Sequence, residues 1–246
     1  MRTNNPVFPA HFYDDWAYRR DVSSTMTVEG TALKSLALLA VLMLTAAWSW
    51  TQVANQQLAG GLVIGAALGG FVVAMITTFK PTAAPITAPI YAALEGVFLG
   101  AISKIIDMRY HGIASQAVML TFGVMLLMLF IYASGLIRVT PRLTAAIVAA
   151  TGALVLVYLG MFLLRIFHVT DFDPFTANPI LGIGLSVAVV ALAAFNLLLD
   201  FEFIQQGSRS GAPKSMEWYG AFGLMVTLVW LYLEILRLLR LLNDRR

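Results

Sequence analysis

The sequence predicts an all-α membrane protein built from seven transmembrane helices. Hydrophobic residues make up 59% of its 246 residues and charged residues only 12%, about half of the roughly 25% that soluble domains carry. The mean hydropathy is +0.81, and charge is scarce over the whole chain after about residue 35. This composition leaves no room for a sizeable soluble domain and indicates a polytopic membrane protein.

Seven apolar runs each approach the ~20 residues that cross a bilayer as a helix. They are continuously apolar, without the alternation of a lipid-facing strand, so helices are favoured over a barrel. Proline clusters precede the third run (Pro81, Pro85, Pro89) and the sixth (Pro174, Pro179). The seventh run is atypical because charged residues interrupt it. The predicted spans are 35–54, 60–79, 87–106, 113–136, 144–167, 180–203 and 218–242.

The distribution of basic residues favours a cytosolic N-terminus. Residues 1–30 are expected to form a flexible cytosolic arm, because they are polar and lack the early apolar region of a signal peptide; residues 31–246 form the transmembrane domain. By the positive-inside rule, an inside N-terminus gives nine basic residues inside and seven outside. The basic C-terminal end fits poorly with seven full crossings, so a re-entrant or displaced last span stays open.

Several function classes are disfavoured by residues that the chain lacks. Cysteine is absent, which excludes thiol catalysis, thiolate metal sites and disulfides. The three histidines, His11, His111 and His168, lie outside the apolar runs. The chain has no tract of consecutive basic residues, so its sequence does not predict nucleic-acid binding. Ser186 lies within a span but has no recognisable base partner, so the chain is predicted not to be an enzyme and to need no cofactor.

Three carboxylates, Glu95, Asp200 and Glu234, lie in or at the edge of the apolar runs. A charge at the bilayer centre costs from ~3 to over ~10 kcal/mol, so such groups usually face the bundle interior and handle protons or ions. Glu95 lies in the middle of the third span. It is interpreted either as a structural acid that is hydrogen-bonded to a neighbouring backbone or as a pathway or coupling group.

The other two acids lie in the last two spans and are the candidate gate. Asn196 precedes Asp200 by four residues on the same helical face and could donate to it. Arg237 follows Glu234 by three residues, which predicts an intrahelical ion pair. Alternatively, Glu234 could share a proton with an acid of a facing helix, because two close carboxyl groups resist simultaneous ionisation.

The segments around these acids resemble the Bax inhibitor-1 superfamily, specifically its bacterial branch. The resemblance extends from residue 26 to the last arginines. Polar positions embedded in apolar sequence make it specific, and the segments that carry it include MTVEGTALK, PIYAALEGVFLGAIS, NLLLDFEFIQQG and APKSMEWYGAFGLMVTLVWLYLEILRLL.

The resemblance implies a seven-helix bundle with the last helix at its centre and a pH-sensitive calcium leak. The leak is controlled by two aspartates that share a proton, and their positions match Asp200 and Glu234 here. Calcium prefers oxygen ligands such as carboxylates, so both residues are candidate calcium contacts. This chain differs from the family pattern in having glutamate at 234 and a longer segment, GSRSGAPKSMEWYG, between the two acids.

The predicted function is therefore a calcium leak channel gated by protons, located in the bacterial cytoplasmic membrane. Its expected partners are the lipid bilayer, calcium and protons. The alternative is a non-conducting regulator that acts on other membrane proteins in stress response or quality control. A proton-coupled transporter is disfavoured, since the two halves show no clear inverted repeat.

Overall fold

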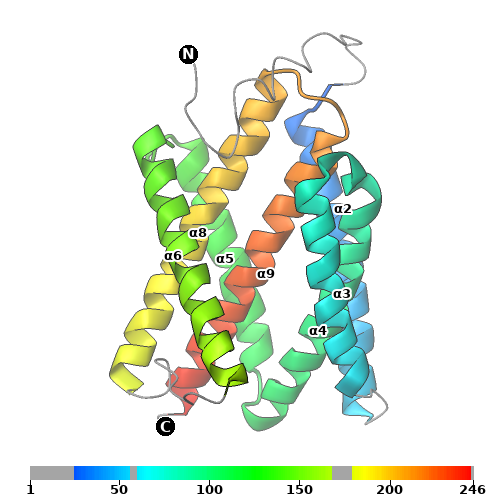
Figure 1. Ribbon diagram of the computed structural model, residues 1–246, viewed down its shortest axis with the longest axis vertical. Helices are drawn as coiled ribbons and strands as arrows, with labels where there is room; N and C mark the ends of the chain where they lie inside the picture. Colours follow the sequence, from blue (N-terminus) through cyan, green and yellow to red (C-terminus); the bar gives the residue numbers. More distant parts are fainter. Residues whose placement is uncertain (1–24, 56–59, 168–178, 245–246) are drawn as a thin grey trace.

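Seven long helices form a bundle in the computed structural model, which describes residues 25–55, 60–167 and 179–244 (Figure 1). All seven are long and apolar enough to cross a membrane; the shortest has 20 residues and extends about 30 Å at 1.5 Å per residue. The predicted fold class is confirmed. The helices are α2 (Val28–Ala54), α3 (Gly60–Phe79), α4 (Ala84–Arg109), α5 (Ile113–Ala133), α6 (Pro141–Ile166), α8 (Pro179–Arg209) and α9 (Met216–Asn243).

The first helix begins earlier than its apolar run. Thr27 is its N-cap, and the Thr27 hydroxyl accepts a 2.9 Å hydrogen bond from the Gly30 amide. Glu29 in the first turn complements the positive end of the helix dipole. The helix therefore starts at Val28, and the boundary expected at residue 30 falls inside it. Residues 1–24, most of the expected arm, lie outside the described residues.

Helix α9 lies at the centre of the bundle. It packs against α2, α4, α5 and α8, whereas α3 packs on α4 and α6 on α8. In Figure 1, α9 runs obliquely between a group formed by α2, α3 and α4 and a group formed by α5, α6 and α8. Its buried residues cover most of the helix circumference, as expected of a helix packed among several others, and the remaining stripe, which includes Tyr219, Trp230 and Arg237, is half-buried.

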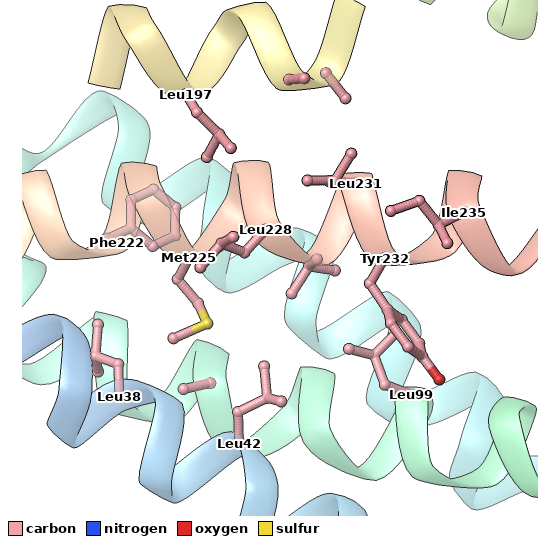
Figure 2. Packing of buried hydrophobic residues seen from close by; sticks show 14 of the residues in the cluster. Leu38, Leu42, Leu99, Leu197, Phe222, Met225, Leu228, Leu231, Tyr232 and Ile235 are labelled. Carbon is pink, nitrogen blue, oxygen red and sulfur yellow. The ribbon is translucent and has the colours of Figure 1, made fainter. Parts of the chain in front are cut away.

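The hydrophobic core forms around α9. Figure 2 shows Met225 of α9 directed toward Leu38 and Leu42 of α2, while Leu197 of α8 approaches α9 from the opposite side. All four side chains are buried, and Leu197 is fully so. The apolar contacts on both sides of α9 join the two helix groups into one core.

The start of α2 and the end of α9 lie at opposite ends of the bundle (Figure 1). Helix α9 contains 28 residues, about 42 Å of helix, and passes through the whole bundle. The option of a re-entrant or displaced last span is therefore not what the structure shows.

Candidate functional site around the central helix

Asp200 lies inside the bundle, where α8 faces α9. Helix α8 continues nine residues beyond it to Arg209, so the carboxyl group does not mark a helix end at the membrane surface. On α9, a Cβ atom added to Gly223 would lie 3.7 Å from Asp200 Oδ1, and the side chain of Thr227, whose hydroxyl donates to the Gly223 carbonyl at 3.2 Å, is close to the carboxyl group. The residue keeps some exposed surface, but its Oδ2 atom is buried and has no hydrogen-bond partner.

Glu234 lies on α9 with only 2% of its surface exposed. Its Oε1 accepts a 3.1 Å hydrogen bond from the Tyr158 hydroxyl of α6. The Arg237 guanidinium contacts Glu234 Oε2 at 2.9 Å and also donates to the Tyr158 hydroxyl at 2.7 Å. The predicted intrahelical Glu–Arg pair is thus present, and Tyr158 extends it to the peripheral helix α6.

The structure does not bring Asp200 and Glu234 together. Asp200 lies at the level of Gly223 and Thr227, whereas Glu234 follows Thr227 by seven residues, about 10 Å along the helix axis. Among the described residues, the two acids share no neighbour: Asp200 lies beside Gly223 and Thr227, and Glu234 contacts Tyr158 and Arg237. The expected proton-sharing contact is therefore not made in this arrangement, because α8 and α9 pack in a different axial register from the one that pairing needs.

Asn196 contacts α6 instead of Asp200. Its side-chain nitrogen donates to the Thr151 hydroxyl at 3.0 Å and to the Leu192 carbonyl at 2.9 Å. Both amide hydrogens are then occupied, so the expected donation to the carboxyl of Asp200 is absent. Together with Tyr158, this contact gives α6 two polar links to the rest of the bundle, which matter because Ile147 is the one residue of α6 that is buried.

Glu95 lies in a different part of the bundle from Asp200 and Glu234. It lies on α4 and is half-buried, and its Oε1 would be 3.1 Å from a Cβ atom added to Gly70 of α3. It therefore lies where α4 packs on α3, whereas Asp200 faces α9 and Glu234 lies on α9. No group of three or more acidic or histidine side chains that could hold a metal ion gathers within the described ranges.

The comparison with known families covers nearly the whole chain. A family model described as Bax inhibitor 1 like matches residues 5–244. The chain belongs to the Bax inhibitor 1 like family. Searches of curated proteins and of solved structures found no match to it.

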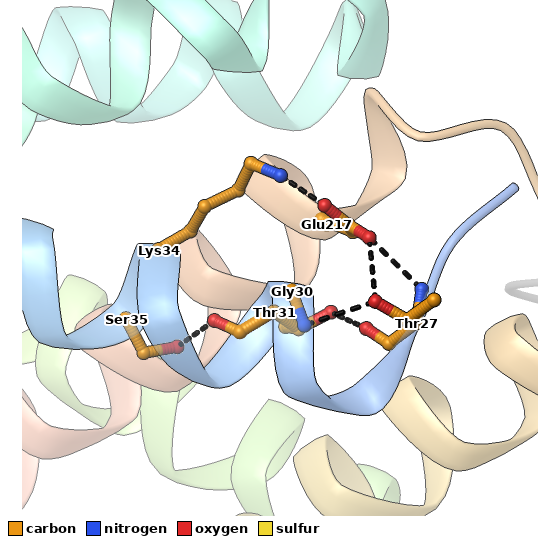
Figure 3. A network of polar contacts seen from close by, with 6 residues as sticks. All are labelled: Thr27, Gly30, Thr31, Lys34, Ser35 and Glu217. Atoms are coloured by element: carbon orange, nitrogen blue, oxygen red, sulfur yellow. Dashed lines mark hydrogen bonds and ion pairs between the residues drawn. The ribbon is translucent and has the colours of Figure 1, made fainter. Parts of the chain in front are cut away.

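This Bax inhibitor 1 like protein also contains a buried ion pair that the sequence interpretation missed. Glu217, in the first turn of α9, is fully buried and forms an ion pair with Lys34 of α2. Its Oε1 also accepts hydrogen bonds from the backbone amide of Thr27 at 2.9 Å and from the Thr27 hydroxyl at 3.0 Å. Figure 3 shows Glu217 between Lys34 and Thr27, joining the starts of the first and last helices.

The loop before α9 takes part in the same junction. The backbone amide of Met26 donates to the Ala212 carbonyl at 2.6 Å, and Thr25 pairs with Pro213 in an isolated β-bridge. From the sequence, this loop was notable only for its length. In this member of the Bax inhibitor 1 like family it is a docking segment for the start of α2, and the signal that could have revealed it is the pair of opposite charges, Lys34 and Glu217, at the same end of two spans.

Proposed function

We propose that this membrane protein is a pH-sensitive calcium leak in which the proton on Asp200 controls the contact between α8 and α9. The observation that carries the proposal is the buried, unpartnered Oδ2 atom of Asp200 at the interface with the central helix. Ionisable groups at such depth in a membrane protein commonly belong to ion or proton pathways.

The proposed switch follows from the cost of burying an uncompensated charge. A protonated Asp200 is neutral and is compatible with close packing against Gly223 and Thr227. Loss of the proton would leave a carboxylate without a counter-ion, a penalty of several kcal/mol. Separation of α8 from α9, or entry of a cation between them, relieves that penalty. Calcium suits the second route because it prefers oxygen ligands, and α9 is then the element whose position the proton biases.

Glu234 has a different role in this proposal. Its charge is balanced by Arg237, and its contact with Tyr158 connects α9 to α6. A movement of α9 would therefore be transmitted to α6. The proton-sharing pair implied by the family resemblance would require α8 and α9 to change their axial register by about 10 Å. Asp200 alone is therefore assigned as the switch.

The test is calcium flux into proteoliposomes from about pH 5 to about pH 8. Wild-type flux is expected to increase with pH by roughly tenfold or more, because a shift of about 1.4 kcal/mol in the opening equilibrium is a factor of ten. Asp200→Asn cannot ionise and is expected to stay at the low-pH flux throughout. Glu202→Gln is the matched control on the same helix and is expected to behave as wild type, because Glu202 bonds to Tyr132 and Gln206.

The Glu234→Gln variant separates the two versions of the gate. A retained pH response in this variant supports Asp200 as the switch, whereas its loss in Glu234→Gln but not in Asp200→Asn would contradict that assignment. If calcium flux is no faster than in protein-free vesicles at every pH, the channel proposal is contradicted. The non-conducting regulatory function would then replace it.

The proposed location is the bacterial cytoplasmic membrane, with the start of α2 facing the cytosol. The supporting observation is the distribution of basic residues over the described helix ends: Lys34, Lys80, Arg138, Arg142, Arg209 and Lys214 lie toward the end of the bundle where α2 starts, and Lys104, Arg109, Arg165, Arg237 and Arg240 toward the other.

Orientation can be measured with single cysteines, since the chain has none of its own. Ser210 and His111 are exposed and lie at opposite ends of the bundle. A maleimide that does not cross membranes is expected to label His111→Cys in intact cells and Ser210→Cys only after permeabilisation. The reverse pattern would show that the start of α2 faces outward.

A further inference from the structure

A cavity of about 440 Å³ lies between α2, α4, α5 and α9. Its floor includes Leu228 and Tyr232 of the central helix, both buried. Its walls include Met43 and Ala47 of α2 and Ser115 of α5, which are exposed on the outer surface of the bundle. The cavity is therefore open sideways, toward the surface that faces lipid in a membrane-spanning bundle.

The lining of this cavity is apolar, and the hydroxyl groups in it are already satisfied. Ser103 and Tyr232 are hydrogen-bonded to each other at 2.6 Å, and Ser103 also contacts the Leu99 carbonyl at 2.5 Å. The Thr121 hydroxyl donates to the Ala117 carbonyl at 2.8 Å. The lining contains no charged side chain. Such a cavity offers no partner to water or to a polar substrate, and it suits a hydrocarbon ligand.

A positive charge lies beside one end of the cavity. Trp50 lines the cavity near the end of α2, and the Lys104 ammonium lies over its ring, 4.9 Å from the centroid. Lys104 is five residues from the end of α4, about 7.5 Å, where a lysine can extend its ammonium to the lipid headgroups. It forms no ion pair with a described residue. The nearby carboxylate of Asp107 accepts a 2.9 Å hydrogen bond from the Gly112 amide.

We propose that this cavity binds one acyl chain of an anionic phospholipid, with the headgroup phosphate at Lys104. The volume lies within the roughly 300–1,000 Å³ of small-molecule sites. A transmembrane helix from a second copy, about 10 Å wide with its side chains, needs a longer and broader groove. An unfilled apolar cavity would forfeit dispersion contacts along its lining, and the surrounding hydrocarbon chains can supply those contacts. This site is independent of the calcium proposal, because it requires no flux.

The test is native mass spectrometry of the full-length protein in micelles, with added phosphatidylglycerol or phosphatidylcholine. The wild type is expected to retain one phosphatidylglycerol molecule. Ala47→Phe fills the mouth of the cavity and is expected to lose that lipid. Ala40→Phe is the matched control, since Ala40 is exposed on the same helix but does not line the cavity, and it is expected to retain the lipid.

The headgroup contact is tested separately. Lys104→Gln is expected to lower the preference for phosphatidylglycerol over phosphatidylcholine by about fivefold, the effect of one basic residue near an anionic membrane surface. Lys80→Gln, at the opposite end of the bundle, is expected to leave it unchanged. Equal retention of both lipids by the wild type would overturn the anionic-lipid assignment.

Two results would overturn the site itself. The first is that Ala47→Phe retains as many lipid molecules as the wild type. The second applies if Ala47→Phe does not fold: Ser115→Phe, which fills the cavity from the α5 side, still retains the lipid. A wild type that retains detergent or a second copy of the chain, and no phospholipid, would equally contradict the proposal.

Discussion

Gly100→Leu is expected to destabilise the bundle strongly. A Cβ atom at Gly100 would overlap the carbonyl oxygen of Ala46 on α2 and lie 2.7 Å from its Cα atom. The obstacle is backbone, which no side-chain rotation can relieve, so α2 would have to move away from α4. Overpacking of this kind is expected to cost at least about 3 kcal/mol. Thermal unfolding in detergent micelles, followed by circular dichroism, measures the loss.

The control is the same substitution in the other glycine motif. Gly96 and Gly100 form a GxxxG pattern in α4, and Gly61, Gly65 and Gly69 form a double one in α3. No atom lies within 4 Å of a Cβ atom built on Gly65. Gly65→Leu is therefore expected to leave the unfolding temperature unchanged or slightly higher, since leucine favours helix over glycine by up to about 1 kcal/mol. Equal destabilisation by the two substitutions would contradict the packing of α2 on α4 described above.

Glu217→Leu is expected to destabilise the protein by about 3 kcal/mol, the lower end of the range for removing one partner of a buried ion pair, because the Lys34 side chain is 18% exposed. The substitution leaves the Lys34 ammonium without its counter-ion and both the amide and the hydroxyl of Thr27 without their acceptor. Urea or thermal unfolding in micelles measures the change. Since Thr27 is the N-cap of α2, faster hydrogen exchange is expected in the first turn of that helix.

A double substitution distinguishes the ion pair from simple packing. Lys34→Met combined with Glu217→Leu removes both charges and is expected to recover part of the lost stability, because a buried pair replaced by apolar groups is often neutral. The unmet hydrogen bonds of Thr27 would account for the remainder. A double variant as unstable as the sum of the single variants would show that the two charges do not act as a pair.

The membrane-spanning helices were predictable because hydropathy over about 20 residues depends on the local sequence alone. The errors in their boundaries have a local cause as well. Helix α2 extends to Val28 because Thr27 caps it, and α8 continues to Arg209 through the less apolar turn that follows Asp200. A hydropathy run detects the part of a helix inside hydrocarbon, not the turns that extend beyond it.

The intrahelical pair of Glu234 and Arg237 was predictable because residues three apart on a helix are neighbours whatever surrounds them. The contact partners of Asp200 and Asn196 were not. Helical periodicity places both residues on one face, but it does not say that Asn196 meets Thr151 of α6 or that Asp200 meets Gly223 of α9. Those contacts depend on which helix is adjacent and on how far the two are displaced along their axes.

The sequence by itself determined the membrane class, the seven spans, the family and the acids that are embedded in apolar sequence. Only the tertiary structure decided that Asp200 and Glu234 lie at different levels of α9, that Glu217 joins the first and last helices, and that the glycines of α4, not Gly65, permit close packing. The physical reason is that contacts between helices depend on crossing angle and axial register, which arise from the packing of the whole bundle and leave no local pattern in the chain.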